Sequence, residues 1–410
     1  MTQAAPEAFA ATVDDSAWQQ TIAQTQASAL NSTPPPTPWR STVLPRIVEE
    51  NGKLRAVSET RLRYEALEAL GEGAMGEVVL AQDNDIERRV AIKRLKSSLE
   101  STQLARFVDE IRTVGRLEHP HIVPIHDVGV DEDGAHFFVM KYVEGETLES
   151  LIARLAQGDT QAHRDFPFPV RLQLFLQVLK AIQFAHSKAI IHRDIKPANI
   201  MIGRFGEVMV MDWGLAKQRQ APERPSNPTE SVEGSRESLF RTRHGSLLGT
   251  PAYMSPEQAS GQNALIDERS DVYALAVVLY ELLTLHHPLE DKQSMQAVLW
   301  GVLNEKPRFA TNWPQQHQPH VPPELAHFLA RAMVKEREQR FESVAAFAAE
   351  LQRVASGHFA IQCPLTFVKR SSSALMHFVD AHPALTLLLF FSFVLSVLGL
   401  AGYGLFALST

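Results

Sequence analysis

Two acidic residues and an amide lie within one short stretch near the middle of the chain. Residues 192–199 have the sequence His-Arg-Asp-Ile-Lys-Pro-Ala-Asn, and Asp212 follows thirteen residues after Asn199. Magnesium takes oxygen ligands and keeps part of its water shell, so Asn199 and Asp212 are suitable ligands for it. Asp194 is then free to accept the proton of a hydroxyl group. The stretch therefore indicates metal-assisted chemistry at a hydroxyl.

A glycine-rich segment lies upstream of this stretch. Residues 71–78 have the sequence Gly-Glu-Gly-Ala-Met-Gly-Glu-Val. The pattern alone is a weak signal, because dinucleotide-binding loops share it, but those loops open a helix. Here β-favouring residues follow, Val78 and Val79 among them. We expect a turn between two strands that lies over phosphate groups, since a side chain at a glycine would keep the backbone away from them.

A lysine ends the next apolar strand. Residues 90–93 have the sequence Val-Ala-Ile-Lys, and Lys93 follows Gly71 by twenty-two positions. An ammonium group is costly to bury unless an opposite charge pairs with it. A negatively charged ligand would stabilise Lys93, and so would Glu110 on the helix predicted next. We therefore expect Lys93 to pair with Glu110 and to hold an anionic ligand.

Taken together, these motifs resemble the eukaryotic-type serine/threonine protein kinases found in bacteria. Residues 61–357 carry G-x-G-x-x-G-x-V, V-A-I-K, H-R-D-x-K-x-x-N and D-x-G in the order and spacing of that family. Residues 249–257 resemble the end of its activation segment. The resemblance implies an α+β, bilobal protein-kinase fold, with a strand-rich N-lobe at 61–143 and a helical C-lobe at 144–357.

The resemblance also implies an activity, which is transfer of phosphate from ATP to serine and threonine hydroxyls of protein substrates. Asp194 would be the catalytic base, and Lys196 would stabilise the phosphate in transfer. Lys93 would hold the α- and β-phosphates and pair with Glu110. Phosphoryl transfer depends mostly on positioning and charge neutralisation, which explains a cluster of charged side chains. The metal would be Mg²⁺, with Mn²⁺ as a substitute, bound by Asn199 and Asp212.

The nucleotide site and two structural contacts follow from the same resemblance. Asp271 would brace the catalytic loop, and Glu257 would form a buried ion pair with Arg340. Trp213 departs from the family's usual phenylalanine, and we expect it to shift the balance of active and inactive states without abolishing metal binding. The glycine loop, the walls of the adenine pocket and the hinge would contact ATP through Leu70, Gly71, Gly73, Gly76, Val78, Ala91, Lys93, Met140, Tyr142, Val143 and Met201.

Regulation is expected in the polar stretch 218–248. Arg193 lies next to Asp194 and implies a basic pocket that a phosphorylated loop residue would fill. We expect autophosphorylation there, best near Thr242 or Ser246, with an unmodified loop as the alternative. The other candidate residues are Ser226, Thr229, Ser231, Ser235 and Ser238.

The two ends of the chain differ from the centre. Residues 1–60 are rich in small and polar residues and predict a disordered leader. Residues 384–410 contain no charged residue and predict a transmembrane helix at 384–408, joined by a linker at 358–383. Lys369 and Arg370 precede it, which places the kinase domain in the cytoplasm of a single-pass inner-membrane protein. A helix buried against the kinase or a partner is the alternative.

Helices and strands follow from periodicity. Strands are expected at 64–70, 77–82, 89–95 and 136–142, and a helix at 104–117. Further helices are expected at 146–156, 169–188, 268–285, 293–302, 323–334 and 343–354.

Two other functions remain open. A pseudokinase would bind nucleotide as a scaffold without catalysis, and a nucleotide enzyme of another kind would use only the glycine loop. The net charge of −7 argues against a nucleic-acid partner, which requires a basic face. The sequence leaves open whether the protein forms a homodimer.

Overall fold

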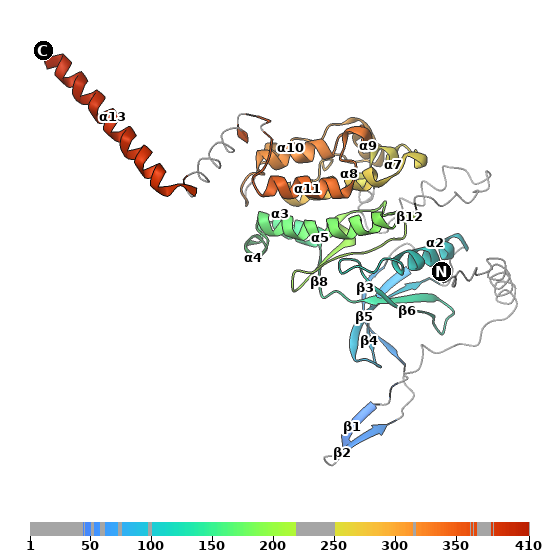
Figure 1. Cartoon of the computed structure of the whole chain (residues 1–410). Coiled ribbons are helices and arrows are strands. Elements are labelled where there is room, and N and C mark those ends of the chain that lie inside the picture. The colour runs from blue at the N-terminus through green and yellow to red at the C-terminus, as the bar shows by residue number, and fades with distance from the viewer. Residues whose placement is uncertain are drawn as a thin grey trace, which may run out of the picture. The chain divides into compact units, whose positions relative to one another are not determined.

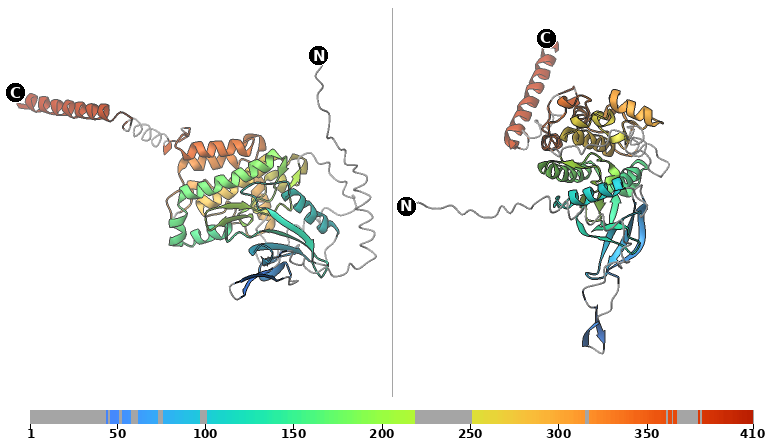
Figure 2. Two further views of the ribbon diagram at one scale, coloured as in Figure 1. Left: turned by 60° about the horizontal axis from the view of Figure 1, so that its bottom comes forward. Right: turned by 90° about the vertical axis from the view of Figure 1, so that its right-hand side faces the viewer.

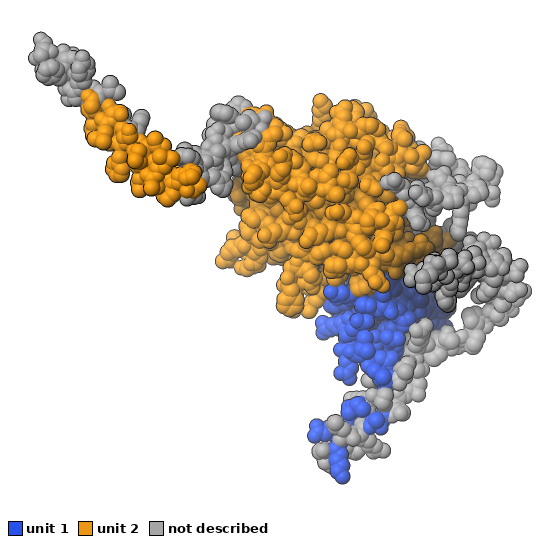
Figure 3. All heavy atoms as spheres, in the orientation of Figure 1, with its two compact units in different colours: residues 1–100, 125–142 blue, residues 101–124, 143–410 orange. Residues whose placement is uncertain are grey.

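The computed structural model places most of the chain in two compact units (Figure 3). Unit 1 comprises residues 1–100 and 125–142, and unit 2 comprises 101–124 and 143–410. Unit 1 is built from strands and unit 2 mainly from helices, as expected for the two lobes. The described residues are 44, 46–50, 53–57, 62–72, 76–96, 101–218, 251–314, 317–360, 362–363, 365–366, 379 and 381–409.

A five-stranded antiparallel sheet forms the body of unit 1 (Figure 1). Its strand order is β3-β4-β5-β7-β6. Successive side chains of a strand point to opposite faces, so Val90 and Ile92 enter the core while Ala91 and Lys93 lie on the other face. The strands are β3 (Tyr64–Glu72), β4 (Gly76–Asp83), β5 (Arg88–Leu95), β6 (Ile125–Val130) and β7 (His136–Lys141).

A separate hairpin precedes this sheet. Strand β1 (Arg46–Glu50) pairs antiparallel with β2 (Lys53–Val57). The sequence between the strands is Asn-Gly, which between alternating residues is a strong signal for a tight hairpin turn. The hairpin at residues 46–57 differs from the disordered leader expected for residues 1–60. The expectation rested on the polar composition of the whole segment and gave no weight to the local turn signal.

Unit 2 is organised around one buried helix, α8 (Glu268–Thr284). Fourteen of its seventeen residues are buried, so protein covers the helix on all sides. Helices α5, α10 and α11 pack against it (Figure 2). The other helices are α2 (Ser101–Val114), α3 (Leu148–Ala156), α4 (Thr160–Asp165), α5 (Phe168–Ser187), α7 (Pro256–Ala259), α9 (Met295–Asn304), α10 (Pro323–Ala332) and α11 (Val344–Ala355).

Short strands and single 3₁₀ turns lie in the segments that connect the helices of unit 2. The strands are β8 (Gly145–Thr147), β9 (Ile190–Ile191), β10 (Ile200–Gly203), β11 (Val208–Val210) and β12 (Lys217–Gln218). The 3₁₀ turns are η1 (Pro197–Asn199), η2 (Pro251–Tyr253), η3 (Asn263–Leu265), η4 (Ala310–Asn312) and η5 (Arg337–Gln339).

Helix α2 groups with unit 2, although the sequence suggested that it belongs to the strand-rich lobe. The segment after it is hydrogen-bonded to β11, with the N–H of Val123 donating to the carbonyl of Val210 at 3.2 Å. The N–H of Val210 in turn donates to the carbonyl of His121 at 2.9 Å. These backbone bonds fasten the α2 segment to unit 2.

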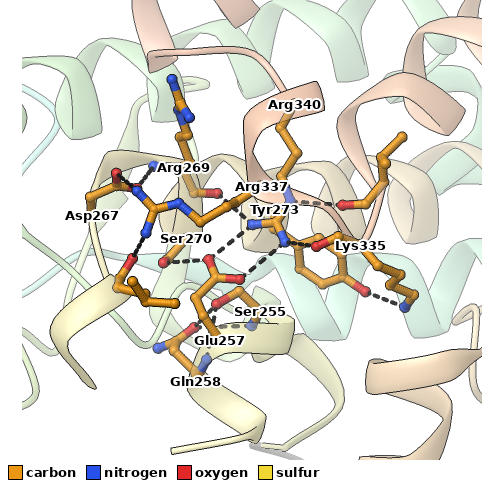
Figure 4. A network of polar contacts seen from close by, with 12 residues as sticks. Ser255, Glu257, Gln258, Asp267, Arg269, Ser270, Tyr273, Lys335, Arg337 and Arg340 are labelled. Carbon is orange, nitrogen blue, oxygen red and sulfur yellow. Dashed lines mark hydrogen bonds and ion pairs between the residues drawn. The ribbon is translucent and has the colours of Figure 1, made fainter. Parts of the chain in front are cut away.

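A buried ion pair fastens α7 to the rest of unit 2 (Figure 4). The guanidinium of Arg340 donates to both carboxylate oxygens of Glu257 at 2.9 and 3.0 Å. The hydroxyl of Ser270, at the start of α8, donates to the same carboxylate at 2.7 Å. Burial raises the pKa of Glu257, but the bonds from Arg340 outweigh it and the net direction is down. The predicted Glu257–Arg340 pair is confirmed.

The last helix is α13 (Pro383–Ser409), which coincides with the apolar segment identified in the sequence. Its described leucine and phenylalanine side chains are exposed, Leu395 and Leu398 among them. Within the part of the chain that the structure describes, no helix has both the length and the apolar character that a membrane crossing requires.

Loss of one partner of the buried ion pair should be costly. We expect Arg340→Met to lower the free energy of unfolding by about 3–5 kcal/mol, because it leaves the carboxylate of Glu257 buried without its counter-ion. Urea denaturation measures this. The matched control is Arg353→Met, which breaks the surface pair with Glu350 and should cost at most about 1 kcal/mol. Equal losses in the two variants would contradict the assignment.

A second carboxylate makes stability depend on pH. Tyr253 donates its hydroxyl to Glu281 at 2.6 Å, and burial raises the pKa of Glu281 to about 7. The folded state therefore holds a proton that the unfolded state releases near pH 4.5, so stability should fall as pH rises from about 4.5 to 7. Glu281→Gln should remove this slope and be the more stable protein at pH 7.5. Denaturation curves at pH 5, 6 and 7.5 test this, and parallel pH profiles for the two proteins would refute it.

Candidate catalytic site

The catalytic loop, residues 192–199, is held by the buried carboxylate of Asp271. One oxygen accepts the N–H of His192 at 2.9 Å, and the other accepts the N–H of Arg193 at 3.0 Å. The ring of His186 lies 2.7 Å from the first oxygen. Burial raises the pKa of Asp271, but these hydrogen bonds outweigh it and hold the pKa below its usual value. The bracing role predicted for Asp271 is confirmed.

His192 connects the catalytic loop to the loop that carries Asp212. Its Nδ1 accepts the N–H of Asp194 at 3.3 Å, so the proton of the neutral ring is on Nε2. Nε2 then donates to the carbonyl of Met211 at 3.3 Å. The ring is fully buried, and its centroid is 4.4 Å from that of Trp213. One imidazole therefore fixes the spacing of the two loops.

Three predicted residues come together inside the catalytic loop. The ammonium of Lys196 donates to Oδ2 of Asp194 at 2.7 Å. The amide nitrogen of Asn199 donates to the same oxygen at 3.1 Å and to the carbonyl of Asp194 at 2.9 Å. These bonds use the nitrogen of the Asn199 amide, so its oxygen is the atom suited to a metal. The loop can thus hold a carboxylate, a cation and a neutral oxygen ligand in one place.

Backbone strain marks both loops. Arg193 has φ 69° and Asp212 has φ 57°, which is the left-handed region. A residue with a side chain costs about 1–2 kcal/mol there and persists only where the surrounding structure fixes it. Glu87, Ala189 and Leu285, which lie outside the site, also have positive φ. Arg193 adjoins the predicted base, Asp194. Asp212 is itself a predicted metal ligand.

Glu110 and Asp212 flank the same glycine. A methyl group placed on Gly214 would lie 3.4 Å from Oδ1 of Asp212 and 3.4 Å from Oε2 of Glu110. Glu110 is buried on α2, and both residues belong to unit 2. Unit 2 therefore collects Asp194, Lys196, Asn199, Asp212 and Glu110.

The other group of predicted residues lies on one face of the sheet in unit 1. Val78 is opposite Lys93 in the β4–β5 register, and Ala91 is opposite Met140 in the β5–β7 register. Ala91 and Lys93 are two positions apart on β5, so all four residues share a face. The ammonium of Lys93 lies 5.7 Å from the ring centroid of Phe138. Lys93 belongs to unit 1, so its pairing with Glu110 stays a prediction.

Gly76 has a structural reason that the sequence did not reveal. A methyl group there would lie 1.9 Å from the carbonyl oxygen of Arg94, so strand β5 passes too close for any side chain. Gly71 has open space, and Leu70 beside it on β3 is 43% exposed. Gly73 lies outside the described residues. Close packing of β4 against β5 therefore requires Gly76, whatever the glycine loop binds.

Three further residues were predicted to contact the nucleotide, namely Tyr142, Val143 and Met201. Tyr142 follows β7 in unit 1, whereas Val143 is buried in unit 2. Met201 lies on β10, opposite Thr147 of β8 and Met209 of β11. Thr242, Ser246 and the other predicted phosphorylation sites lie outside the described residues.

Two contributors to the site were missed at the sequence level. His192 was part of the motif, yet we assigned it no role, and Gln258 was not considered. The amide nitrogen of Gln258 donates to the carbonyl of Arg193 at 2.8 Å, which ties α7 to the catalytic loop. The bond from His192 to Met211 and the bond from Gln258 to Arg193 both end on backbone carbonyls, which the sequence does not mark. The only available signal for His192 was its position as a polar residue inside the motif.

Known proteins resemble this chain over the same region. The protein kinase domain model matches residues 64–351. The serine/threonine-protein kinase PknD of Protochlamydia amoebophila is 35% identical over 311 residues, which cover 72% of this chain and 30% of that protein. The protein of the same name from Chlamydia caviae is 34% identical over 303 residues, with 72% and 31% covered.

The chain spans about 30% of the length of the curated relatives it matches. The matched region nevertheless contains every predicted catalytic and metal-binding residue in both units. With the family model covering most of its 410 residues, the chain belongs to the protein kinase family.

Proposed function

We propose that this protein transfers the γ-phosphate of ATP to serine and threonine hydroxyls of proteins. The observation that carries the proposal is the contact of Lys196 and Asn199 with the carboxylate of Asp194. A pairing lysine and an amide oxygen ligand beside a carboxylate suit the charges of phosphoryl transfer. The names of the bacterial relatives support serine and threonine as the acceptors.

The proposed chemistry divides among the side chains of the catalytic loop. Lys196 and Asn199 both reach Oδ2 of Asp194, so we assign Oδ1 to the substrate hydroxyl, whose proton it accepts. From its place beside Asp194, Lys196 neutralises charge on the phosphate in transfer. Asn199 and Asp212 present oxygen ligands suited to Mg²⁺ or Mn²⁺, which when bound supplies charge neutralisation at the phosphates.

In unit 1 we assign Lys93 to the α- and β-phosphates of ATP, paired with Glu110. Val78, Ala91 and Met140 place apolar side chains beside Lys93 on one face of the sheet. Such a face suits a planar base with the phosphates toward the lysine. This assignment covers nucleotide binding, whereas the catalytic loop covers transfer.

A nucleotide-binding scaffold without catalysis is the second candidate. It predicts the same fold and the same nucleotide site, so only turnover separates the two. The catalytic, metal-binding and phosphate-binding positions all carry the side chains that the reaction requires, which favours the enzyme.

We also propose that α13 attaches the kinase to a membrane, with the kinase domain in the cytoplasm. Residues 384–410 carry no charged side chain, and Lys369 and Arg370 precede them. Large apolar side chains of the described part of α13 are exposed, with Leu388 at 65% and Leu395 at 70%. Exposed apolar surface of this extent is costly in water and calls for a lipid or protein cover.

Removal of the proposed base should abolish phosphoryl transfer. We expect Asp194→Asn to lower the rate of ATP-dependent phosphorylation by about 10²–10⁴-fold, because an amide cannot accept the hydroxyl proton. Labelled ATP with a generic protein substrate measures this, and the label on the kinase itself reports autophosphorylation. ATP affinity should change little.

The matched control for this experiment is Asp165→Asn, at an exposed aspartate on α4. It removes the same charge outside the proposed site and should leave the rate unchanged. Absence of turnover in the wild-type protein, with ATP still bound, would favour the scaffold instead.

Membrane attachment predicts a change of cell fraction. A chain that ends at His382 should move from the membrane pellet to the soluble fraction and keep its kinase activity. Immunoblots of ultracentrifuged lysates measure the distribution. A full-length protein that is already soluble, or a truncated one that stays in the pellet after a high-salt wash, would refute the role of α13.

A further inference from the structure

The side chain of Gln258 joins α7 to the catalytic loop, and the mechanism proposed above makes no use of it. Its amide nitrogen donates to the carbonyl of Arg193 at 2.8 Å. Its amide oxygen accepts the N–H of Ser255 at 3.0 Å and the hydroxyl of Ser255 at 3.1 Å. Figure 4 shows Gln258 beside Ser255 at the start of α7. One amide therefore connects two segments that are 65 positions apart in the sequence.

The partners of Gln258 require an amide at this position. The N–H of Ser255 can only donate a hydrogen bond, and the carbonyl of Arg193 can only accept one. The side chain between them must therefore present an acceptor at one atom and a donor at the other. A neutral amide does this, whereas an ionised carboxylate has acceptors only and an apolar side chain has neither.

The position of Gln258 is itself fixed by the surrounding structure. Ser255 is 0% exposed and caps α7, with its hydroxyl accepting the N–H of Gln258 at 3.4 Å. The neighbouring residue, Glu257, forms the buried ion pair with Arg340. Because α7 is held both by its cap and by this ion pair, Gln258 can act as a rigid support for the catalytic loop.

The bond from Gln258 acts on the peptide unit that precedes Asp194. That planar unit contains the carbonyl of Arg193 and the N–H of Asp194. Gln258 holds the carbonyl, and Nδ1 of His192 accepts the N–H at 3.3 Å. The N–H of Arg193 is bound in turn by Asp271 at 3.0 Å. The backbone that leads into Asp194 is therefore oriented by three side chains, of which Gln258 belongs to α7.

The strain at Arg193 makes this support necessary. Its φ of 69° persists only where the surrounding structure imposes it. Without the bond from Gln258, the carbonyl of Arg193 would be free to rotate toward an unstrained conformation. Such a rotation would turn the carboxylate of Asp194 as well, and a misplacement of about 1 Å at a reacting group can cost about 10²-fold in rate.

We propose that Gln258 is a positioning residue for phosphoryl transfer, which sets the direction of the Asp194 carboxylate by holding the peptide unit before it. This inference rests on the function proposed above, with Asp194 as the base. Gln258 acts through the backbone, so its effect falls on kcat and not on the affinity for ATP. Correct placement of α7 thereby becomes a condition for transfer.

Substitution of Gln258 in the full-length protein tests the proposal. Gln258→Met keeps the length of the side chain and removes its donor, and Gln258→Glu keeps the shape but replaces the donor with a second acceptor. With labelled ATP and a generic protein substrate, we expect kcat to fall about tenfold in Gln258→Met and at least as far in Gln258→Glu, whose carboxylate faces the carbonyl of Arg193. The KM for ATP should stay unchanged, and both variants should melt above the assay temperature.

The matched control is Gln177→Met on α5. The amide nitrogen of Gln177 also donates to a backbone carbonyl, that of Gly206, at 3.4 Å. This substitution removes the same kind of bond outside the catalytic loop and should leave kcat unchanged.

A double-mutant cycle separates positioning from general support of the fold. If Gln258 acts through Asp194, adding Gln258→Met to Asp194→Asn should leave the small residual rate unchanged, because the base that it positions is already lost. A loss of the same size in both backgrounds would show that Gln258 does not act through Asp194 and would overturn the proposal.

Other outcomes would also decide against it. If the wild-type protein is active and kcat is unchanged in both Gln258 variants, this inference fails and the proposed function stands. Melting of both variants below the assay temperature would assign the bond to fold stability instead. An inactive wild-type protein would remove the proposed function and this inference together.

Discussion

The buried carboxylate of Asp271 is the interaction on which the candidate site depends. It lies at the start of α8, the most buried helix of unit 2, and accepts two successive backbone N–H groups of the catalytic loop. A carboxylate that is removed from water is costly unless hydrogen bonds replace its hydration. Here the loop supplies that replacement, so the cost of burial becomes a strong preference for one loop conformation. The packing of α8 thereby sets the position of Asp194.

This preference explains how the strained residues persist. Arg193 and Asp212 both have left-handed backbones without being glycine, and each is adjacent to a fixed point. The N–H of Arg193 is bound by Asp271, and its carbonyl accepts the amide of Gln258. Asp212 follows Met211, whose carbonyl accepts Nε2 of His192. These hydrogen bonds hold the backbones of Arg193 and Asp212 in the left-handed conformation.

Much of the fold could be read from the sequence. The helix predicted at 268–285 is Glu268–Thr284, and that predicted at 169–188 is Phe168–Ser187, because long apolar segments between clear end signals leave little choice. Helix α4 was missed because six residues are too few to show a period. Strand β6, which alternates half-buried and exposed residues beside β7, was missed for lack of a strong apolar pattern.

The candidate site divides in the same way. Motif order brought Asp194, Lys196 and Asn199 together correctly, since six consecutive positions of a tight loop cannot lie far apart. What the sequence could not give were bonds to backbone atoms of distant segments, such as that of His192 to Met211. Those contacts exist only once the chain is folded. Every residue has a backbone carbonyl, so residue type does not indicate which carbonyl accepts a hydrogen bond.

Trp213 shows what a departure from the family pattern costs and gains. The side chain is 1% exposed, and its indole N–H has no hydrogen-bond partner among the described residues. A buried donor without an acceptor costs about 1–3 kcal/mol, which a phenylalanine would avoid. In return the larger ring packs against His192, the residue that joins the two loops. The unpaired indole N–H and the contact with His192 both lie where the catalytic loop meets the loop that carries Asp212. Trp213 therefore affects how stably the two loops are held together, and it touches no reacting atom.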